Sequence, residues 1–118
     1  MLDLQKKLPP PCKAAARFVD VLGEHTALKL ILELGGSEVF IGEQPRGRGM
    51  VETTIGYQSA LALRAAMLEP SFRIPLATGW VAQCLYVQGM SKNAIARRLR
   101  VSDQTVRRII QRMEVVDG

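Results

Sequence analysis

The sequence predicts a mainly α-helical protein with short β-strands, in which an N-terminal helix-strand repeat forms a dimerisation domain and a helix-turn-helix follows. Two observations support this prediction. A segment of the N-terminal part recurs further along the chain, and two capping serines divide the basic C-terminal stretch into two helices. We expect a mobile arm at residues 1–13, the dimerisation domain at 14–76 and the helix-turn-helix at 77–118.

The composition is that of a folded intracellular protein. The 118 residues are 47% hydrophobic, which lies above the range of disordered chains. No apolar run approaches the roughly 18 residues that cross a bilayer, and the first residues lack the apolar core of a secretion signal. Cys12 and Cys84 form no metal-binding spacing. We therefore expect a cytoplasmic protein without a metal or cofactor.

An internal repeat occupies the first two-thirds of the chain. Residues 21–42 align without a gap with residues 54–75, so that Gly23 matches Gly56 at an offset of 33 residues. A turn signal interrupts both copies, Gly35-Gly36 in the first and, one position later in the alignment, Glu69-Pro70 in the second. Each copy is therefore expected to be one supersecondary unit, made of a helix, a break and a short strand.

The two predicted strands, residues 39–41 and 71–74, suggest that a second chain completes the domain. A two-stranded ribbon is marginal alone, and about 60 residues bury only a small core. Both shortfalls disappear if two chains pool their strands and helices, so we predict a homodimer through residues 14–76. The alternative is that the ribbon packs on helices of its own chain. The residues expected in the dimer interface are Leu28, Ile31, Val39, Ile41, Leu61, Phe72 and Ile74.

The stretch SKNAIARRLRVSDQTVRRII, residues 91–110, predicts two helices joined by a turn rather than one basic helix. Ser91 and Ser102 each precede a segment of helical apolar periodicity, and a serine hydroxyl caps a helix by accepting a free backbone N–H. A preceding apolar helix at 76–88 ends at Gly89. Three helices with this short turn are typical of a helix-turn-helix.

The basic excess lies on the same segment. Residues 79–118 hold seven Lys/Arg and three Asp/Glu, whereas residues 1–78 hold nine and eight, within a net charge of +5. Clustered cations suit a polyanion such as DNA, although an anionic membrane surface would also satisfy the charge alone. Between the repeats, Arg46 and Arg48 of the loop 43–49 either contact DNA or lie on a solvated connector, and the connector is favoured.

The helix from Asp103 to about Met113 is the predicted recognition helix. Glutamine can form paired hydrogen bonds with adenine, and arginine can do so with guanine. The residues expected to contact bases are Gln104, Thr105, Arg107 and Arg108. The residues expected to contact phosphates, at helix starts and flanks, are Ser91, Lys92, Asn93, Arg97, Arg100, Ser102 and Arg112. Arg100 occupies a turn position that usually holds glycine, at a cost of about 1 kcal/mol.

These elements together resemble the Mor/C family, the middle and late transcription activators of Mu-like bacteriophages. The resemblance rests on LGEHTALKLILELGGSEVFI, its second copy, IPLA and QGMSKNAIARRLRVSDQTVRRII, and covers about residues 16–113. It implies a dimer that binds inverted-repeat promoter DNA and recruits bacterial RNA polymerase, in the bacterial nucleoid or a phage-infected cell. Two features depart from the family pattern: the second copy lacks Gly-Gly and has its turn at Glu69-Pro70, and Arg100 lies in the turn of the helix-turn-helix.

Other functions are less well supported by the residues. An enzyme is not expected, because His25 is the sole histidine and no Ser/His/Asp grouping, acid pair or phosphate-binding glycine loop occurs. A repressor would use the same DNA-binding residues as an activator. An accessory module that uses the helix-turn-helix only for packing would not depend on Gln104 or Arg108.

Overall fold

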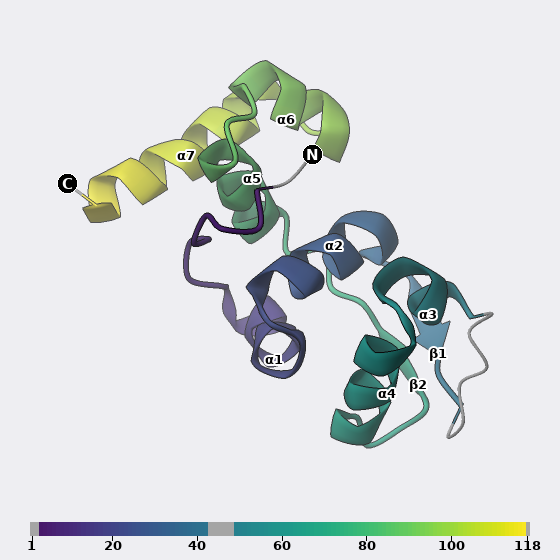
Figure 1. Cartoon of the computed structure of the whole chain (residues 1–118). Coiled ribbons are helices and arrows are strands. Elements are labelled where there is room, and N and C mark those ends of the chain that lie inside the picture. The colour runs from purple at the N-terminus through teal and green to yellow at the C-terminus, as the bar shows by residue number, and fades with distance from the viewer. Residues whose placement is uncertain (1–2, 43–48, 118) are drawn as a thin grey trace. The chain divides into compact units, whose positions relative to one another are not determined.

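The computed structural model describes residues 3–42 and 49–117, which fall into two compact units (Figure 1). We call Pro11–Ala77 the repeat domain, and Met1–Pro10 together with Thr78–Gly118 the helix-turn-helix unit. The predicted contacts of Arg46 and Arg48 lie outside the described residues.

The repeat domain contains two copies of one arrangement, helix–glycine–helix–strand. The first copy is α1 (Lys13–Leu22), α2 (Glu24–Leu34) and β1 (Glu38–Phe40), and the second is α3 (Met50–Ile55), α4 (Tyr57–Ala66) and β2 (Ser71–Arg73). Each copy therefore has a helix before the glycine that the sequence alignment did not include. At the offset of 33 residues α3 corresponds to the second half of α1, and the buried residues Phe18 and Val51 occupy equivalent positions.

Gly23 and Gly56 join the two helices of each copy in the same backbone conformation. Their φ and ψ angles are 83° and 160° for Gly23 and 90° and 162° for Gly56, a region that essentially only glycine populates. Each glycine carbonyl accepts a hydrogen bond of 3.0 Å, from the N–H of Ala27 in the first copy and of Ala60 in the second. The alignment of the two glycines thus corresponds to an equivalence in three dimensions.

The strands β1 and β2 pair with each other, antiparallel, within one chain. Val39 lies opposite Phe72, and the pair faces the helices: Val39 is 5% exposed, and the Phe72 ring lies 6.4 Å from the Phe18 ring. Glu38 and Phe40 are exposed on the other face of the ribbon. The ribbon therefore packs on helices of its own chain, which is the alternative that the sequence left open beside a homodimer.

The residues predicted to form a dimer interface lie largely inside this chain's core. The buried ones are Leu28, Ile31, Val39, Ile41 and Ile74, whereas Leu61 and Phe72 are half-buried. A second chain could not contact the buried side chains without opening the repeat domain. Apolar periodicity identified them as buried but did not specify whether one chain or two would bury them.

The helix-turn-helix unit contains the three helices α5 (Thr78–Val87), α6 (Lys92–Leu99) and α7 (Asp103–Asp117). They pack on one another through apolar side chains, and Cys84 is one of the fully buried residues, as expected for a core cysteine. The helix α5 is apolar nearly all round, so α6 and α7 alone leave part of its surface to be covered.

The N-terminal segment, residues 3–10, supplies that cover, which differs from the predicted mobile arm. Leu8 is 3% exposed, and the indole Nε1–H of Trp80 donates a hydrogen bond of 2.9 Å to the Pro9 carbonyl. At the other end of α5, the side-chain amide of Gln88 accepts from the backbone N–H of Asp3 at 2.6 Å and donates to its carbonyl at 3.0 Å. These contacts fix the segment along α5.

Candidate nucleic-acid interface

The start of α6 is fixed by the predicted serine cap. The Ser91 Oγ accepts a hydrogen bond of 3.1 Å from the N–H of Ala94. Just before it, Gly89 has a φ of 97° and the N–H of Met90 donates to the Leu85 carbonyl at 3.0 Å, which closes the end of α5. Together, these local bonds end one helix and begin the next within a few residues.

The turn between α6 and α7 uses Arg100 in the left-handed conformation. Its φ and ψ are 59° and 43°, and the N–H of Val101 donates to the Ala96 carbonyl at 3.1 Å, as in a Schellman motif. The prediction that Arg100 replaces a positive-φ glycine is confirmed. Because the Arg100 side chain is exposed, the turn carries a cation that glycine would not supply.

The start of α7 is capped by Ser102. Its Oγ accepts from the N–H of Thr105 at 3.1 Å and lies 2.9 Å from the Thr105 hydroxyl. Thr105 is half-buried, and its hydroxyl is engaged with Ser102. This pair holds the first turn of α7, so Thr105 is better placed to position the helix than to contact a base.

The remaining predicted base contacts lie on the exposed side of α7. Gln104, Arg107 and Arg108 are exposed, whereas Val106 and Ile110 on the opposite side are buried. Because side chains three and four positions apart share a helix face, Gln104 and Arg108 form one strip. Gln111 is exposed on the same strip but was not among the predicted contacts. Gln111 lies three residues after Arg108, and this helical spacing in the sequence is the signal that places it on the strip.

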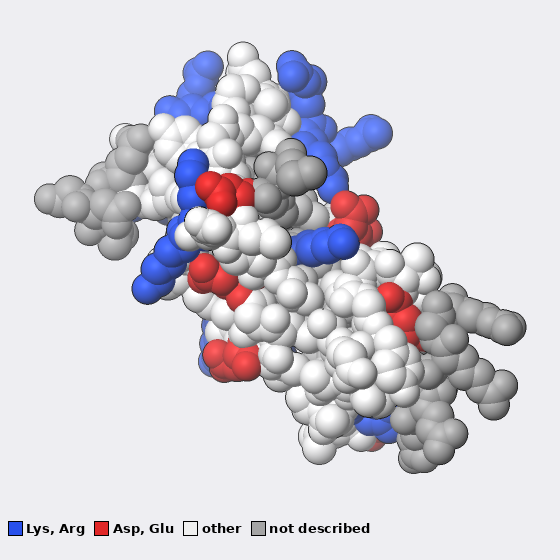
Figure 2. Space-filling model, in the orientation of Figure 1, with Lys and Arg blue, Asp and Glu red and all other residues white. Residues whose placement is uncertain are grey.

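The predicted phosphate contacts lie on α6, at its two ends and along α7. Lys and Arg side chains gather over α6 and α7 in Figure 2. The Nζ of Lys92 lies 5.8 Å from the centroid of the Tyr86 ring, a cation–π contact that restrains this half-buried lysine. The other predicted phosphate contacts are all exposed: Ser91, Asn93, Arg97, Arg100, Ser102 and Arg112.

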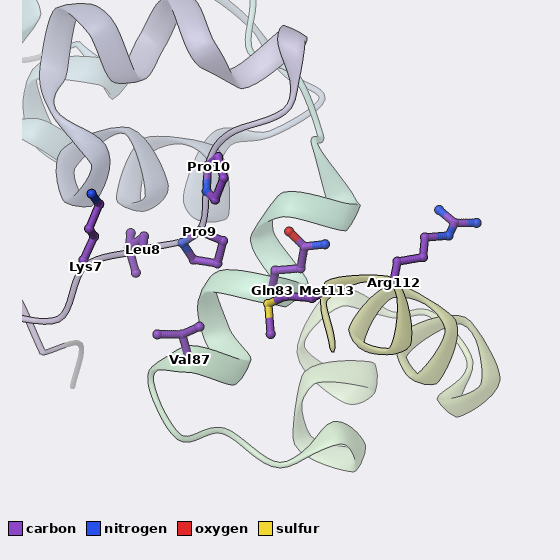
Figure 3. Close-up of a pocket in the computed structure, with 8 residues that line it drawn as sticks. All are labelled: Lys7, Leu8, Pro9, Pro10, Gln83, Val87, Arg112 and Met113. Atoms are coloured by element: carbon purple, nitrogen blue, oxygen red, sulfur yellow. The ribbon is translucent and has the colours of Figure 1, made fainter. Parts of the chain in front are cut away.

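A groove of about 530 Å³ lies in the same unit, between the N-terminal segment, α5 and the later part of α7 (Figure 3). Its walls are largely apolar, with Leu8, Val87 and Met113 among them. Lys7 and Arg112 lie at opposite ends of the groove and do not point to a common position. Binding sites for small molecules usually combine apolar walls with converging polar groups, and this groove lacks that convergence.

The described residues do not cluster in the way that a metal site requires. Among them, no group of three His, Cys, Asp or Glu side chains could hold a metal ion. His25 lies with its Nε2 3.8 Å from the Glu24 carboxylate, far along the chain from the basic helices. Over residues 3–42 and 49–117, no helix combines the length and hydropathy needed to cross a membrane.

Comparison with known proteins agrees with the geometry of this unit. A family model described as a homeodomain-like domain matches residues 81–114, which run from α5 into α7. No curated protein and no solved structure matches the chain. The predicted helix-turn-helix is thereby confirmed, and a homeodomain-like helix-turn-helix is typical of sequence-specific DNA binding. The match covers the three-helix region and does not extend to the repeat domain.

Proposed function

We propose that this chain is a sequence-specific DNA-binding transcription regulator that acts by binding and not by catalysis. The observation that carries the proposal is the exposed strip of Gln104, Arg108 and Gln111 on α7, within a match to a homeodomain-like domain. A helix in this position of a helix-turn-helix enters the major groove, where its early residues meet base edges.

The side chains of α7 supply donors that suit bases. Gln104 can pair with N6 and N7 of adenine, and Arg108 can pair with O6 and N7 of guanine. Arg107 lies beside this strip and is exposed, so it reaches either a neighbouring base or a phosphate. Thr105 and Ser102 hold the first turn of α7 and thereby set the angle at which Gln104 is presented.

The cations of α6 and its ends would hold the phosphate backbone. Arg97 and Arg100 are exposed, and Ser91 and Ser102 place their hydroxyls at helix starts, where backbone N–H groups also favour an anion. Such contacts release condensed counterions, so we expect the affinity for any duplex to fall steeply as salt is raised. They fix the register of the helix on DNA but add no direct discrimination among bases.

The resemblance to the Mor/C family extends the proposal to the regulatory outcome. It favours a phage or prophage activator that binds promoter DNA in the bacterial cell and recruits RNA polymerase. A repressor would place the same α7 residues on DNA and differ only in the position of the site. A promoter reporter separates the two, because an activator raises transcription from a promoter that carries the site and a repressor lowers it.

The number of chains on one site is a separate property of the complex. The family resemblance favours a homodimer on an inverted repeat. However, the side chains expected in such an interface are largely buried in the chain's own core. The base contacts of α7 are the same in either case, so the proposal of sequence-specific binding does not depend on dimer formation.

Selection of bound sites from random duplex DNA, near physiological salt, tests the proposal. We expect a short motif to be enriched, and the double variant Gln104→Ala/Arg108→Ala to lose that enrichment while remaining folded. If the native chain enriches no motif, α7 does not discriminate bases, and the helix-turn-helix serves packing in an accessory module.

A further inference from the structure

We infer that the repeat domain is a twofold-symmetric dimer contained within one chain, and that one chain therefore binds one asymmetric DNA site. The first half of this inference concerns the fold and stands on the repeat domain alone. The second half names the class of DNA site and rests on the function proposed above.

The clearest sign of the internal symmetry is a pair of equivalent hydrogen bonds at the two ends of the ribbon. The N–H of Ile41 donates to the Pro70 carbonyl at 2.9 Å, and the N–H of Ile74 donates to the Ser37 carbonyl at 2.9 Å. Ile74 is the repeat equivalent of Ile41, and Pro70 is the equivalent of Ser37. Exchanging the two copies therefore turns each hydrogen bond into the other.

The residues at the centre of the ribbon obey the same relation. Val39 and Phe72 are equivalent positions of the two copies, and they lie directly opposite each other in the antiparallel pairing. A residue that faces its own equivalent marks the position of a twofold axis. The matching backbone angles of Gly23 and Gly56 extend the equivalence from the strands to the helices.

An interface of this kind is the one that two identical chains usually form. In a twofold dimer, the same surface of each partner meets the other, so that residue i contacts j and j contacts i. Here both partners belong to one chain. A two-stranded ribbon with a small core led to the prediction of a second chain. The second copy of the repeat supplies the missing strand and core within one chain, and Ile41 and Ile74 are both buried.

The DNA-binding part of the chain does not share this symmetry. Over residues 3–42 and 49–117, the helices α5, α6 and α7 follow the second copy and have no counterpart after the first, so a symmetric core carries a single helix-turn-helix unit. Palindromic operators mirror proteins that present two such units related by a twofold axis. Because the second copy of the repeat already occupies the twofold interface within the chain, one chain presents one unit, which matches a single unrepeated motif as a homeodomain does.

Cysteine cross-linking tests whether the strands pair within one chain. Glu38 and Arg73 lie directly opposite each other, and both are exposed. We would place Glu38→Cys and Arg73→Cys in a Cys12→Ser background, since Cys12 is exposed and Cys84 is buried. Arg73 also donates to the Gly36 carbonyl, and that bond lies outside the core.

Oxidation of this double variant should give a cross-linked monomer that migrates differently from its reduced form on a denaturing gel. A disulfide-linked dimer as the main product would overturn the inference, because it would mean that the strands pair between chains. The single variant Glu38→Cys is the matched control, since it has no partner cysteine within its own ribbon.

The mass of the unmodified chain, free and on its selected duplex, tests the second half. We expect a mass of 13.0 kDa in sedimentation, one chain per duplex and a motif without an inverted repeat. Two chains on an inverted repeat would overturn the assignment of an asymmetric site. If the cross-link forms within the monomer but no duplex is bound specifically, the proposed function fails while the internal symmetry stands.

Discussion

Arg100 holds the turn before α7 in a conformation that glycine adopts at lower cost. We predict that Arg100→Gly raises the free energy of unfolding by about 1 kcal/mol, because it removes the left-handed penalty of a side chain. Arg100→Ala keeps that penalty, so its stability should stay close to that of the native chain. Urea denaturation measures both variants. Equal stabilities for the glycine and alanine variants would contradict this account of the turn.

The two variants of Arg100 also separate stability from DNA binding. Each removes one cation from the predicted phosphate contacts, so each should weaken binding to all duplexes alike. The slope of log affinity against log salt should fall by about 1 in both. An unchanged slope would show that Arg100 does not contact the backbone.

Gln104 and Arg108 should contribute to discrimination rather than to general affinity. We predict that Gln104→Ala and Arg108→Ala each weaken binding to the selected site by about 1–3 kcal/mol. Lys29→Ala is the control, since Lys29 is an exposed cation on α2 in the repeat domain. Fluorescence anisotropy at fixed salt measures all three. An equal loss in the Lys29 variant would point to a non-specific charge effect.

Among the elements, the N-terminal segment provides a matched pair of leucines. Leu8 is 3% exposed and Leu4 is 70% exposed. We expect Leu8→Ala to destabilise the helix-turn-helix unit by about 2–4 kcal/mol, as truncation of a buried leucine does. Leu4→Ala should stay within about 0.5 kcal/mol of the native chain. Trp80 fluorescence, monitored during thermal unfolding, reports on this unit. Similar effects of the two variants would mean that the segment does not pack on α5.

The two inter-helix glycines give a test of the repeat at the level of its elements. Gly23→Ala and Gly56→Ala should each cost about 1–3 kcal/mol, because their φ and ψ suit only glycine. No neighbouring atom lies within 4 Å of either added Cβ, so the cost is conformational.

Gly79→Ala is the control for these glycines. Gly79 lies in the first turn of α5, has no positive φ and has equal space around it. Its replacement should be neutral or stabilise the fold by up to about 1 kcal/mol, because alanine favours helix more than glycine does. An equal loss in the free energy of unfolding for all three variants would contradict this account, because the positive-φ conformation would then not be the reason for glycine at positions 23 and 56.

At the scale of the whole molecule, local signals predicted more than long-range ones. The capping serines Ser91 and Ser102 and the turn at Arg100 were predictable, because each depends on residues within one helical turn. The cover that Leu8 provides for α5 was not, since a proline-rich start without periodicity is typical of an arm. The strands were predictable as strands, but their spacing could not tell pairing within a chain from pairing between chains.

The two units also differ in how directly the sequence indicates their roles. The helix-turn-helix unit combines capping, apolar periodicity and basic charge on one segment, and the homeodomain-like match covers that segment. The repeat domain carries internal symmetry, and its described residues, 11–42 and 49–77, show no comparable cluster of basic side chains. We therefore propose that the helix-turn-helix unit makes the DNA contacts.

The affinity of the purified chain for its selected site, compared with a shuffled duplex of equal composition at the same salt, tests the central claim most directly. The account predicts that the selected site binds at least about 1,000-fold more tightly, as sequence-specific proteins do, and that Gln104→Ala/Arg108→Ala removes most of this difference. Equal affinities for the two duplexes would contradict it, because the binding would then come from charge alone.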